Sequence, residues 1–377
     1  MIMTKPIWIV SAKRTVQGRF LGALTRHTAT GLGVAAAKAA LNGIDPARID
    51  AVVVGNVLSA GLGMNVARQI GMGAGLPVST PAYTVNMMCA SGMHAVLLAV
   101  QSIQSGAARM VLCGGTESMS NAPYLLERAR SGYKFGDGVL VDSMLRDGLT
   151  DAFSREHMGL TAEKIAGLYN ISREAQDRFA LASQQRHAHA RAAGHFRDEL
   201  VTVDKLDHDE HARPETTQES LASLKPVFNR EGSVTAGNSS GLNDGAAMLV
   251  VCDEKIGQEC GLTPLMVITR HAVVGCDPSL MGMGPVHATR KITQRPGEFD
   301  VVELNEAFAA QALACIKELG LDEAKVNPDG GAISLGHPIG ASGARLLVHL
   351  AHRRPKRGLA TLCVGGGMGY AVVVEQP

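Results

Sequence analysis

The sequence predicts an α/β fold built from two related halves, with an inserted segment between them. Apolar segments typical of strands alternate with helical segments of about 10 to 18 residues, as in α/β proteins. Three landmarks also recur at nearly one spacing, which favours a duplicated unit over the general likeness of glycine-rich strand ends. Their pairs are separated by 249, 251 and 250 residues and are Asn56 with Asn305, Ala90 with Ala341, and Cys113 with Cys363. We place the first half at residues 1–117, an inserted loop domain at 118–245 and the second half at 246–377.

Each predicted element follows from its local pattern. In the first half, the strand IDAVVVGNV leads to an asparagine loop, the apolar helix after Cys89 carries a terminal glycine at Gly106, and RMVLCGGTES forms the next strand. In the insertion, Ser172 and Gly194 bound a helix as its cap and its stop. In the second half, residues 306–319 predict a helix, and LATLC and YAVVVE predict strands around a glycine-rich loop.

The composition is that of a soluble globular protein with a large core. Hydrophobic residues make up 46% of the 377 residues and charged residues 19%, with a formal net charge of +1. The charge balance lacks the excess of basic residues that is typical of nucleic-acid-binding proteins. No apolar run approaches the roughly 20 residues that span a membrane. The N-terminus lacks a signal-peptide core, and the scattered cysteines form no C-x-x-C pair. We therefore expect free thiols in the cytoplasm.

Cys89 lies directly before Ala-Ser-Gly at the N-terminus of the predicted apolar helix. It could be a packing residue, a redox thiol, a metal ligand or a nucleophile. Free N–H groups at a helix N-terminus favour a thiolate and can lower the pKa of such a thiol. The duplication places Gly340 where the first half has Cys89, and His337 lies just before it in a loop constrained by glycine and proline. If the halves pack about a pseudo-twofold axis, His337 comes near Cys89, which is the pairing that nucleophilic catalysis needs.

Cys363 and Asn305 are further candidates. Cys363 ends a predicted strand and meets a glycine-rich loop, whose backbone N–H groups can form an oxyanion hole. Asn305 lies between a predicted strand and the predicted helix that follows it, and it could cap that helix or take part in catalysis. The histidine-rich stretches at 187–190 and 207–211 lack the spacing of a metal site, so we place them on the solvated surface and predict no bound metal.

With these residues in hand, the chain resembles the thiolase family from end to end. The matching motifs are VNMMCASG, NEAFAAQ, GGAISLGHPIGASGAR and TLCVGGGMG, with HMG at 157–159 and TAGNSSGLNDGAA at 235–247. The likeness is greatest to the acetyl-CoA acetyltransferase branch, through NVLSAGLGMNVARQ and APYLLERARSGYKFGDG. It implies a thiolase fold with five αβαβα layers. It also implies a homotetramer, because the segment around 120–140 resembles the tetramerisation loop of the family.

The resemblance implies an acyltransferase that condenses two acetyl-CoA molecules to acetoacetyl-CoA and CoA, and that catalyses the reverse thiolysis. Cys89, activated by His337, would carry the acetyl group, and Cys363 would remove an α-proton from the second acetyl-CoA. One oxyanion site would use His337 and a water held by Asn305. The other would use the backbone N–H groups of Cys89 and Gly365. Coenzyme A thioesters enter as substrates, and no further cofactor is implied.

The same motifs imply a coenzyme A site on and beside the insertion. It would be lined by Leu149, His157, Met158, Phe228, Ser240, Ala307 and Phe308. Arg213 falls near a phosphate contact of the family, in a stretch that is shorter here than is usual. Two alternatives stay open: a degradative thiolase that cleaves longer 3-ketoacyl-CoA in fatty acid metabolism, and a thiolase-like lipid carrier that has lost catalysis. The complete set of Cys89, His337 and Cys363 argues against the carrier, since binding alone needs none of them.

Overall fold

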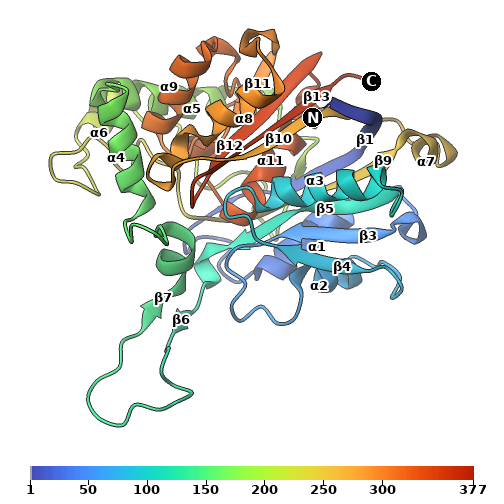
Figure 1. The fold of residues 1–377 in the computed structure, drawn as a ribbon, viewed down its shortest axis with the longest axis horizontal. Coiled ribbons are helices and arrows are strands. Elements are labelled where there is room, and N and C mark those ends of the chain that lie inside the picture. Colours follow the sequence, from blue (N-terminus) through green and yellow to red (C-terminus); the bar gives the residue numbers. More distant parts are fainter. Residues whose placement is uncertain (1) are drawn as a thin grey trace.

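Two groups of strands, one from each half, make up the central sheet (Figure 1). The computed structural model describes the backbone of residues 2–377 and the side chains from residue 6 onward. The first group consists of β1 (Ile2–Thr15), β3 (Ala51–Gly55), β4 (Ala82–Val85), β5 (Met110–Ser118) and β9 (Asn243–Asp253). The second group consists of β10 (Met266–Gly275), β11 (Val301–Leu304), β12 (Arg357–Val364) and β13 (Met368–Glu375).

The strand order repeats the predicted duplication. Within the described residues the main path runs β4-β3-β5-β9-β1-β10-β13-β12-β11, and the short strands β2 (Gly18–Arg19) and β8 (Leu200–Val201) pair with β9 and β1. β3–β5 and β11–β12 pair in parallel, whereas β5–β9 and β12–β13 pair antiparallel. β1 and β10 join the two groups, with Trp8 opposite Val267. Strand β9 pairs with β5 and β1 of the first half, although most of its residues follow the predicted boundary at 245.

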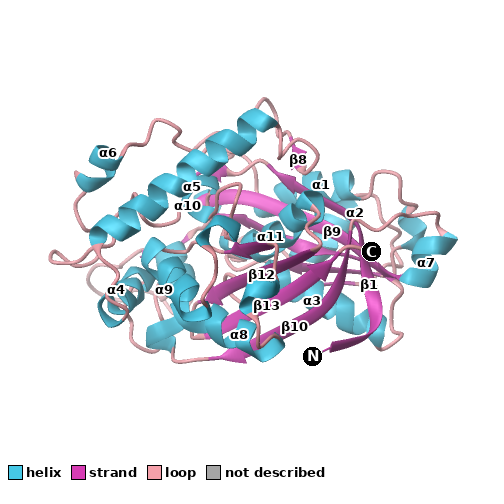
Figure 2. Cartoon of the chain, turned by 90° about the horizontal axis from the view of Figure 1, so that it is seen from above, coloured by secondary structure: helices cyan, strands magenta, loops and turns pink. Residues whose placement is uncertain are grey.

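Helices cover the strands in layers, as Figures 1 and 2 show. Between the two groups of strands lie α3 (Ser91–Gln104) and α11 (Ile339–Arg353), whose side chains join one core with residues of both groups. Helices α1 (Ala29–Ala40), α2 (Val66–Gly73) and α7 (Glu254–Glu259) pack on the outer side of the first group. Helices α8 (Gly284–Ile292) and α9 (Ala309–Leu319) pack on the outer side of the second. The predicted α/β fold of two related, layered halves is confirmed.

The insertion supplies most of the remaining elements. These are β6 (Tyr124–Leu125), β7 (Val141–Asp142), α4 (Met158–Leu168), α5 (Arg173–Ala193) and α6 (Gln218–Ala222), with the short α10 (Ala332–Leu335) in the second half. Helix α5 follows its predicted bounds: the Ser172 side chain accepts the N–H of Ala175, and Gly194 ends the helix at φ 77°. Between β6 and β7 the chain forms a long loop that projects from the body (Figure 1). No helix in the described part of the chain is long and apolar enough to cross a bilayer.

The helix predicted for residues 306–319 begins later than expected, at Ala309. The preceding residues are extended because their backbone pairs with another segment: Ala307 accepts the N–H of Ser240 at 3.0 Å, and Ala309 donates to Asn238 at 2.9 Å. Asn305 therefore cannot cap this helix, and that interpretation is wrong. At the other end, Gly320 stops the helix as a glycine at φ 61° can.

Buried ion pairs join the insertion to both halves. Arg14 on β1 bonds Glu199 at 2.6 Å and Asp209 at 2.7 Å, and His349 on α11 bonds Glu199 at 2.9 Å. Burial alone would raise the pKa of Glu199, but Arg14 and His349 hold it at about 2. His187 is also buried, so the prediction that both histidine-rich stretches are solvated is wrong for His187 and Asp209. Their burial depends on partners that lie far away in sequence.

Candidate active site

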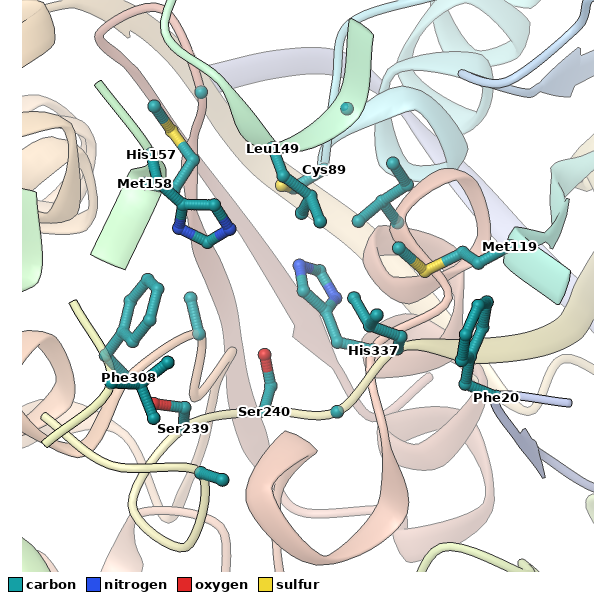
Figure 3. Close-up of a pocket in the computed structure, with 18 of the residues that line it drawn as sticks. Phe20, Cys89, Met119, Leu149, His157, Met158, Ser239, Ser240, Phe308 and His337 are labelled. Atoms are coloured by element: carbon teal, nitrogen blue, oxygen red, sulfur yellow. The ribbon is translucent and has the colours of Figure 1, made fainter. Parts of the chain in front are cut away.

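A cavity of about 500 Å³ collects nearly all of the predicted site residues. Its walls include Cys89, His337, Cys363 and Gly365, which come from the two halves. They also include every residue predicted to bind coenzyme A: Leu149, His157, Met158, Arg213, Phe228, Ser240, Ala307 and Phe308. Figure 3 shows Cys89 and His337 pointing into the same space from different segments. The volume is in the range of small-molecule sites.

Cys89 lies in a tight turn that leads into α3. Met88 has φ 47°, a left-handed conformation that is rare for a residue with a side chain. The Ser91 hydroxyl holds this turn, since it accepts the N–H of Met87 at 2.8 Å and donates to the carbonyl of Met88 at 2.7 Å. The turn therefore directs the thiol into the cavity, at a cost in backbone strain.

The resting Cys89 is a thiol, although a helix N-terminus can favour a thiolate. Burial raises its pKa to about 11, although the N–H groups of Gly365 and of Cys89 itself oppose the shift. The charge of Glu117 adds to the rise. The helix N-terminus is present as predicted, but desolvation outweighs it. A nearby base must therefore take the proton when this sulfur attacks.

His337 lines the same cavity as Cys89 and has the tautomer that such a base needs. Its Nδ1 lies 2.6 Å from the Ser342 hydroxyl, which donates its one hydrogen to the carbonyl of Pro338 at 2.9 Å. Nδ1 therefore carries the ring hydrogen, and Nε2, which has no hydrogen-bond partner, keeps its lone pair free. Burial, with a smaller contribution from the charge of Arg345, lowers the pKa of His337 to about 4. The imidazole is therefore neutral near pH 7 and able to accept a proton.

We expect Ser342→Ala to lower kcat by about tenfold or more, because the ring loses the partner that sets its tautomer. The KM for the substrate should change little, since Ser342 does not line the cavity. Ser105→Ala is the matched control: its hydroxyl also donates to a carbonyl one turn earlier, that of Ser102, but at the far end of α3. Steady-state rates of both variants check the prediction, and equal rates would contradict it.

Cys363 lies at the end of β12, on the same wall as Cys89. Burial and then the proximity of Cys89 raise its pKa well above that of a free thiol, so both sulfurs rest protonated. Two residues further on, the backbone N–H of Gly365 faces the sulfur of Cys89. An oxygen on a carbon bonded to this sulfur would thus be near two backbone donors, the N–H groups of Gly365 and Cys89.

Asn305 does not line the cavity, but its amide is unusual. The side chain is fully buried, and neither its oxygen nor its nitrogen has a hydrogen-bond partner, while its backbone N–H donates to Thr361. Buried amides are almost always paired, with protein or with water. The water that the resemblance implies at Asn305 would be one partner for this amide, and it stays a prediction.

The outer part of the cavity is aromatic and polar. His157 Nδ1 accepts the N–H of Gly159 at 3.0 Å, so its Nε2 carries the hydrogen. Its ring stacks on Phe228 at 4.6 Å, and Phe228 meets Phe308 edge to face at 6.3 Å. Sequence reasoning missed several wall residues, among them Arg19, Phe20 and His211. It also missed Ser342 and Glu117, although the repeated Ala-Ser-Gly and the strand-end glutamate were visible signals.

Models of the two thiolase domains match almost the whole chain. The thiolase N-terminal domain matches residues 7–255, and the thiolase C-terminal domain matches residues 262–376. The chain belongs to the thiolase family. Among its relatives, an acetyl-CoA acetyltransferase of Chromobacterium violaceum is 50% identical over 98% of this chain and 99% of that protein. One of Escherichia coli is also 50% identical, over 98% of each chain.

Solved thiolase structures share the fold closely. Human mitochondrial 3-ketoacyl-CoA thiolase has a TM-score of 0.96 at 44% identity, covering 99% of both chains. The same enzyme in complex with CoA has a TM-score of 0.97 at 43% identity, covering 100% of this chain and 99% of that one. Bacillus anthracis acetyl-CoA acetyltransferase has a TM-score of 0.95 at 41% identity, covering 99% of both. The predicted thiolase fold is confirmed.

Proposed function

We propose that this thiolase is an acetyl-CoA C-acetyltransferase, which joins two acetyl-CoA molecules into acetoacetyl-CoA and free CoA and runs the reverse thiolysis. The observation that carries the proposal is that Cys89, His337 and Cys363 line one cavity. The two relatives at 50% identity, both acetyl-CoA acetyltransferases, support the acetyl substrate over longer chains. The catalytic set also speaks against a carrier without catalysis.

The first half-reaction moves the acetyl group to the protein. The Cys89 sulfur attacks the thioester carbonyl as its proton passes to Nε2 of His337. The bond from the carbonyl to the CoA sulfur then breaks, and the departing sulfur takes the proton of Cys363, which rests as a thiol. The N–H groups of Cys89 and Gly365 stabilise the oxyanion, and each such donor contributes about 3 kcal/mol.

The second half-reaction forms the carbon–carbon bond. Cys363, now a thiolate, removes an α-proton from the second acetyl-CoA, and the carbanion attacks the acetyl group on Cys89. The bond to Cys89 breaks and its sulfur recovers the proton from His337. His337 and the water on Asn305 stabilise the enolate oxygen. All protons return to their starting groups, so the reaction uses only the two thioesters and no further cofactor.

The proposal includes a site and an assembly. The pantetheine arm of CoA passes between Leu149, Met158 and the aromatic wall. The phosphates of CoA approach Arg213 at the mouth of the cavity. A homotetramer is supported by the projecting loop between β6 and β7, which exposes apolar side chains to solvent: Leu126 by 44%, Phe135 by 102%, Val139 by 74% and Leu140 by 63%. Seven free cysteines suit the reducing cytoplasm.

The function is tested by incubating the protein with acetyl-CoA and mapping the adduct by mass spectrometry. We expect an acetyl group on Cys89 and release of CoA, followed by acetoacetyl-CoA. In the reverse direction, 3-ketoacyl-CoA substrates with four to twelve acyl carbons are compared in the presence of CoA. Cleavage should be fastest for acetoacetyl-CoA. Faster cleavage of the long chains would favour the degradative thiolase, and no adduct on Cys89 would contradict the enzyme.

A further inference from the structure

Glu117, at the end of β5, is a fully buried carboxylate that accepts four N–H groups. One oxygen accepts the side-chain N–H of Asn56 at 2.8 Å and the backbone N–H of Leu58 at 3.2 Å. The other accepts the backbone N–H groups of Val57 and Gly340, each at 3.0 Å. All four partners are donors, and a carboxylic acid would have to point its own hydrogen at one of them. Burial raises the pKa of Glu117 to about 7, and the four donors oppose that shift. The arrangement therefore favours the ionised form above that pH.

These donors come from both halves of the duplicated fold. Residues 56–58 follow β3 in the first half, whereas Gly340 lies in the first turn of α11 in the second, directly after the loop of His337. The N-terminus of a helix favours a negative charge at this place. One carboxylate thus connects the half that carries Cys89 to the loop that carries His337.

The contact also explains why the repeat has glycine where the first half has Cys89. A side-chain carbon on Gly340 would lie 2.5 Å from the carbonyl oxygen of Thr116 and 2.7 Å from the Glu117 carboxylate. Only glycine at this position can therefore bring its backbone N–H to the Glu117 carboxylate. In the first copy the equivalent N–H, that of Cys89, faces the reacting sulfur instead.

We propose that Glu117 is a positioning residue for the condensation, whose carboxylate sets the His337 loop of one half against Cys89 of the other. The inference rests on the proposed function. Glu117 does not line the cavity, so it acts through the groups that it holds. Burial is the main cause of the raised pKa of the Cys89 thiol, and the charge of Glu117 adds to it.

The test compares Glu117→Gln, Glu117→Asp and the control Asp50→Asn. Asp50 accepts the N–H groups of Arg109 and Met110 at the opposite end of β5, far along the strand from the cavity. For each protein, kcat and KM are measured, and alkylation of Cys89 by iodoacetamide is followed against pH by mass spectrometry. Glu117→Gln should lose about 10- to 100-fold in kcat with little change in KM. Its alkylation midpoint should move down by about one pH unit, because a negative charge is removed.

Glu117→Asp keeps the charge but shortens the reach, so we expect a wild-type alkylation midpoint with a reduced kcat. Asp50→Asn should match wild type in both kcat and the alkylation midpoint of Cys89. An unchanged kcat in Glu117→Gln, or a lower kcat without a shifted midpoint, would overturn the role. If Glu117→Gln does not fold, a wild-type kcat in Glu117→Asp overturns it. Wild-type protein that makes no acetoacetyl-CoA contradicts the proposed function instead, and the alkylation midpoints, which need no turnover, still decide whether Glu117 acts on Cys89.

Discussion

Cys363→Ala is expected to accept an acetyl group on Cys89 and yet to form almost no acetoacetyl-CoA. The attack in the first half-reaction needs Cys89 and His337, both of which remain, so the acetyl group still reaches Cys89, although the departing CoA sulfur no longer receives the proton of Cys363. The second half-reaction loses the base that removes the α-proton. A positioned general base contributes about 10²- to 10⁴-fold to a rate, so condensation should fall by that factor or more. Mass spectrometry of the acetyl-enzyme and the rate of acetoacetyl-CoA formation measure the two steps separately.

The repeat supplies a matched control for this variant. Cys113 holds the place in the first half that Cys363 holds in the second, and it is equally buried, but its thiol faces the inner core rather than the cavity. Cys113→Ala should therefore condense acetyl-CoA at nearly the wild-type rate. Condensation by Cys363→Ala at the rate of Cys113→Ala would disprove the assignment of the base.

Arg14→Leu is expected to destabilise the fold by about 3–5 kcal/mol, because it leaves buried carboxylates without their cation. Arg14 is 1% exposed and bonds both Glu199 and Asp209. Arg109→Leu is the control: Arg109 also meets two carboxylates, Asp253 and Glu259, but at the surface. Such exposed pairs contribute little to stability, because water and salt screen them. Chemical unfolding of both variants at pH 7 measures the difference.

The pH dependence of this loss follows from the pKa values. The pKa of Glu199 falls from 4.5 to about 2 on folding, and that of Asp209 falls well below its usual value, because in both cases Arg14 outweighs burial. Their stabilising effect is present above pH 4.5 and is lost as the pH falls toward 2. The gap between wild type and Arg14→Leu should therefore narrow below pH 4.5. A gap that stays constant down to pH 3 would argue against the ion pairs as its source.

Much of the fold was readable from local patterns. Ser172 and Gly194 bound α5 as predicted, because a capping side chain and a left-handed glycine act within one helical turn. The duplicated landmarks predicted two halves with the same order of strands and helices. The wall of the cavity contains the predicted Cys89, His337 and Cys363. These features depend on short-range geometry or on a repeat, and both can be recognised in the amino-acid sequence.

What the sequence determined by itself was therefore the duplicated α/β architecture and most of the candidate residues that line the cavity. Only the tertiary structure decided their state: the Cys89 thiol, whose pKa a helix N-terminus could have lowered, is protonated, and Asn305 is a buried unpaired amide rather than a cap. The same holds for Glu117, whose four donors come from segments far apart in sequence. Charge and proton affinity depend on desolvation and on distant partners, and neither exists until the two halves close on each other.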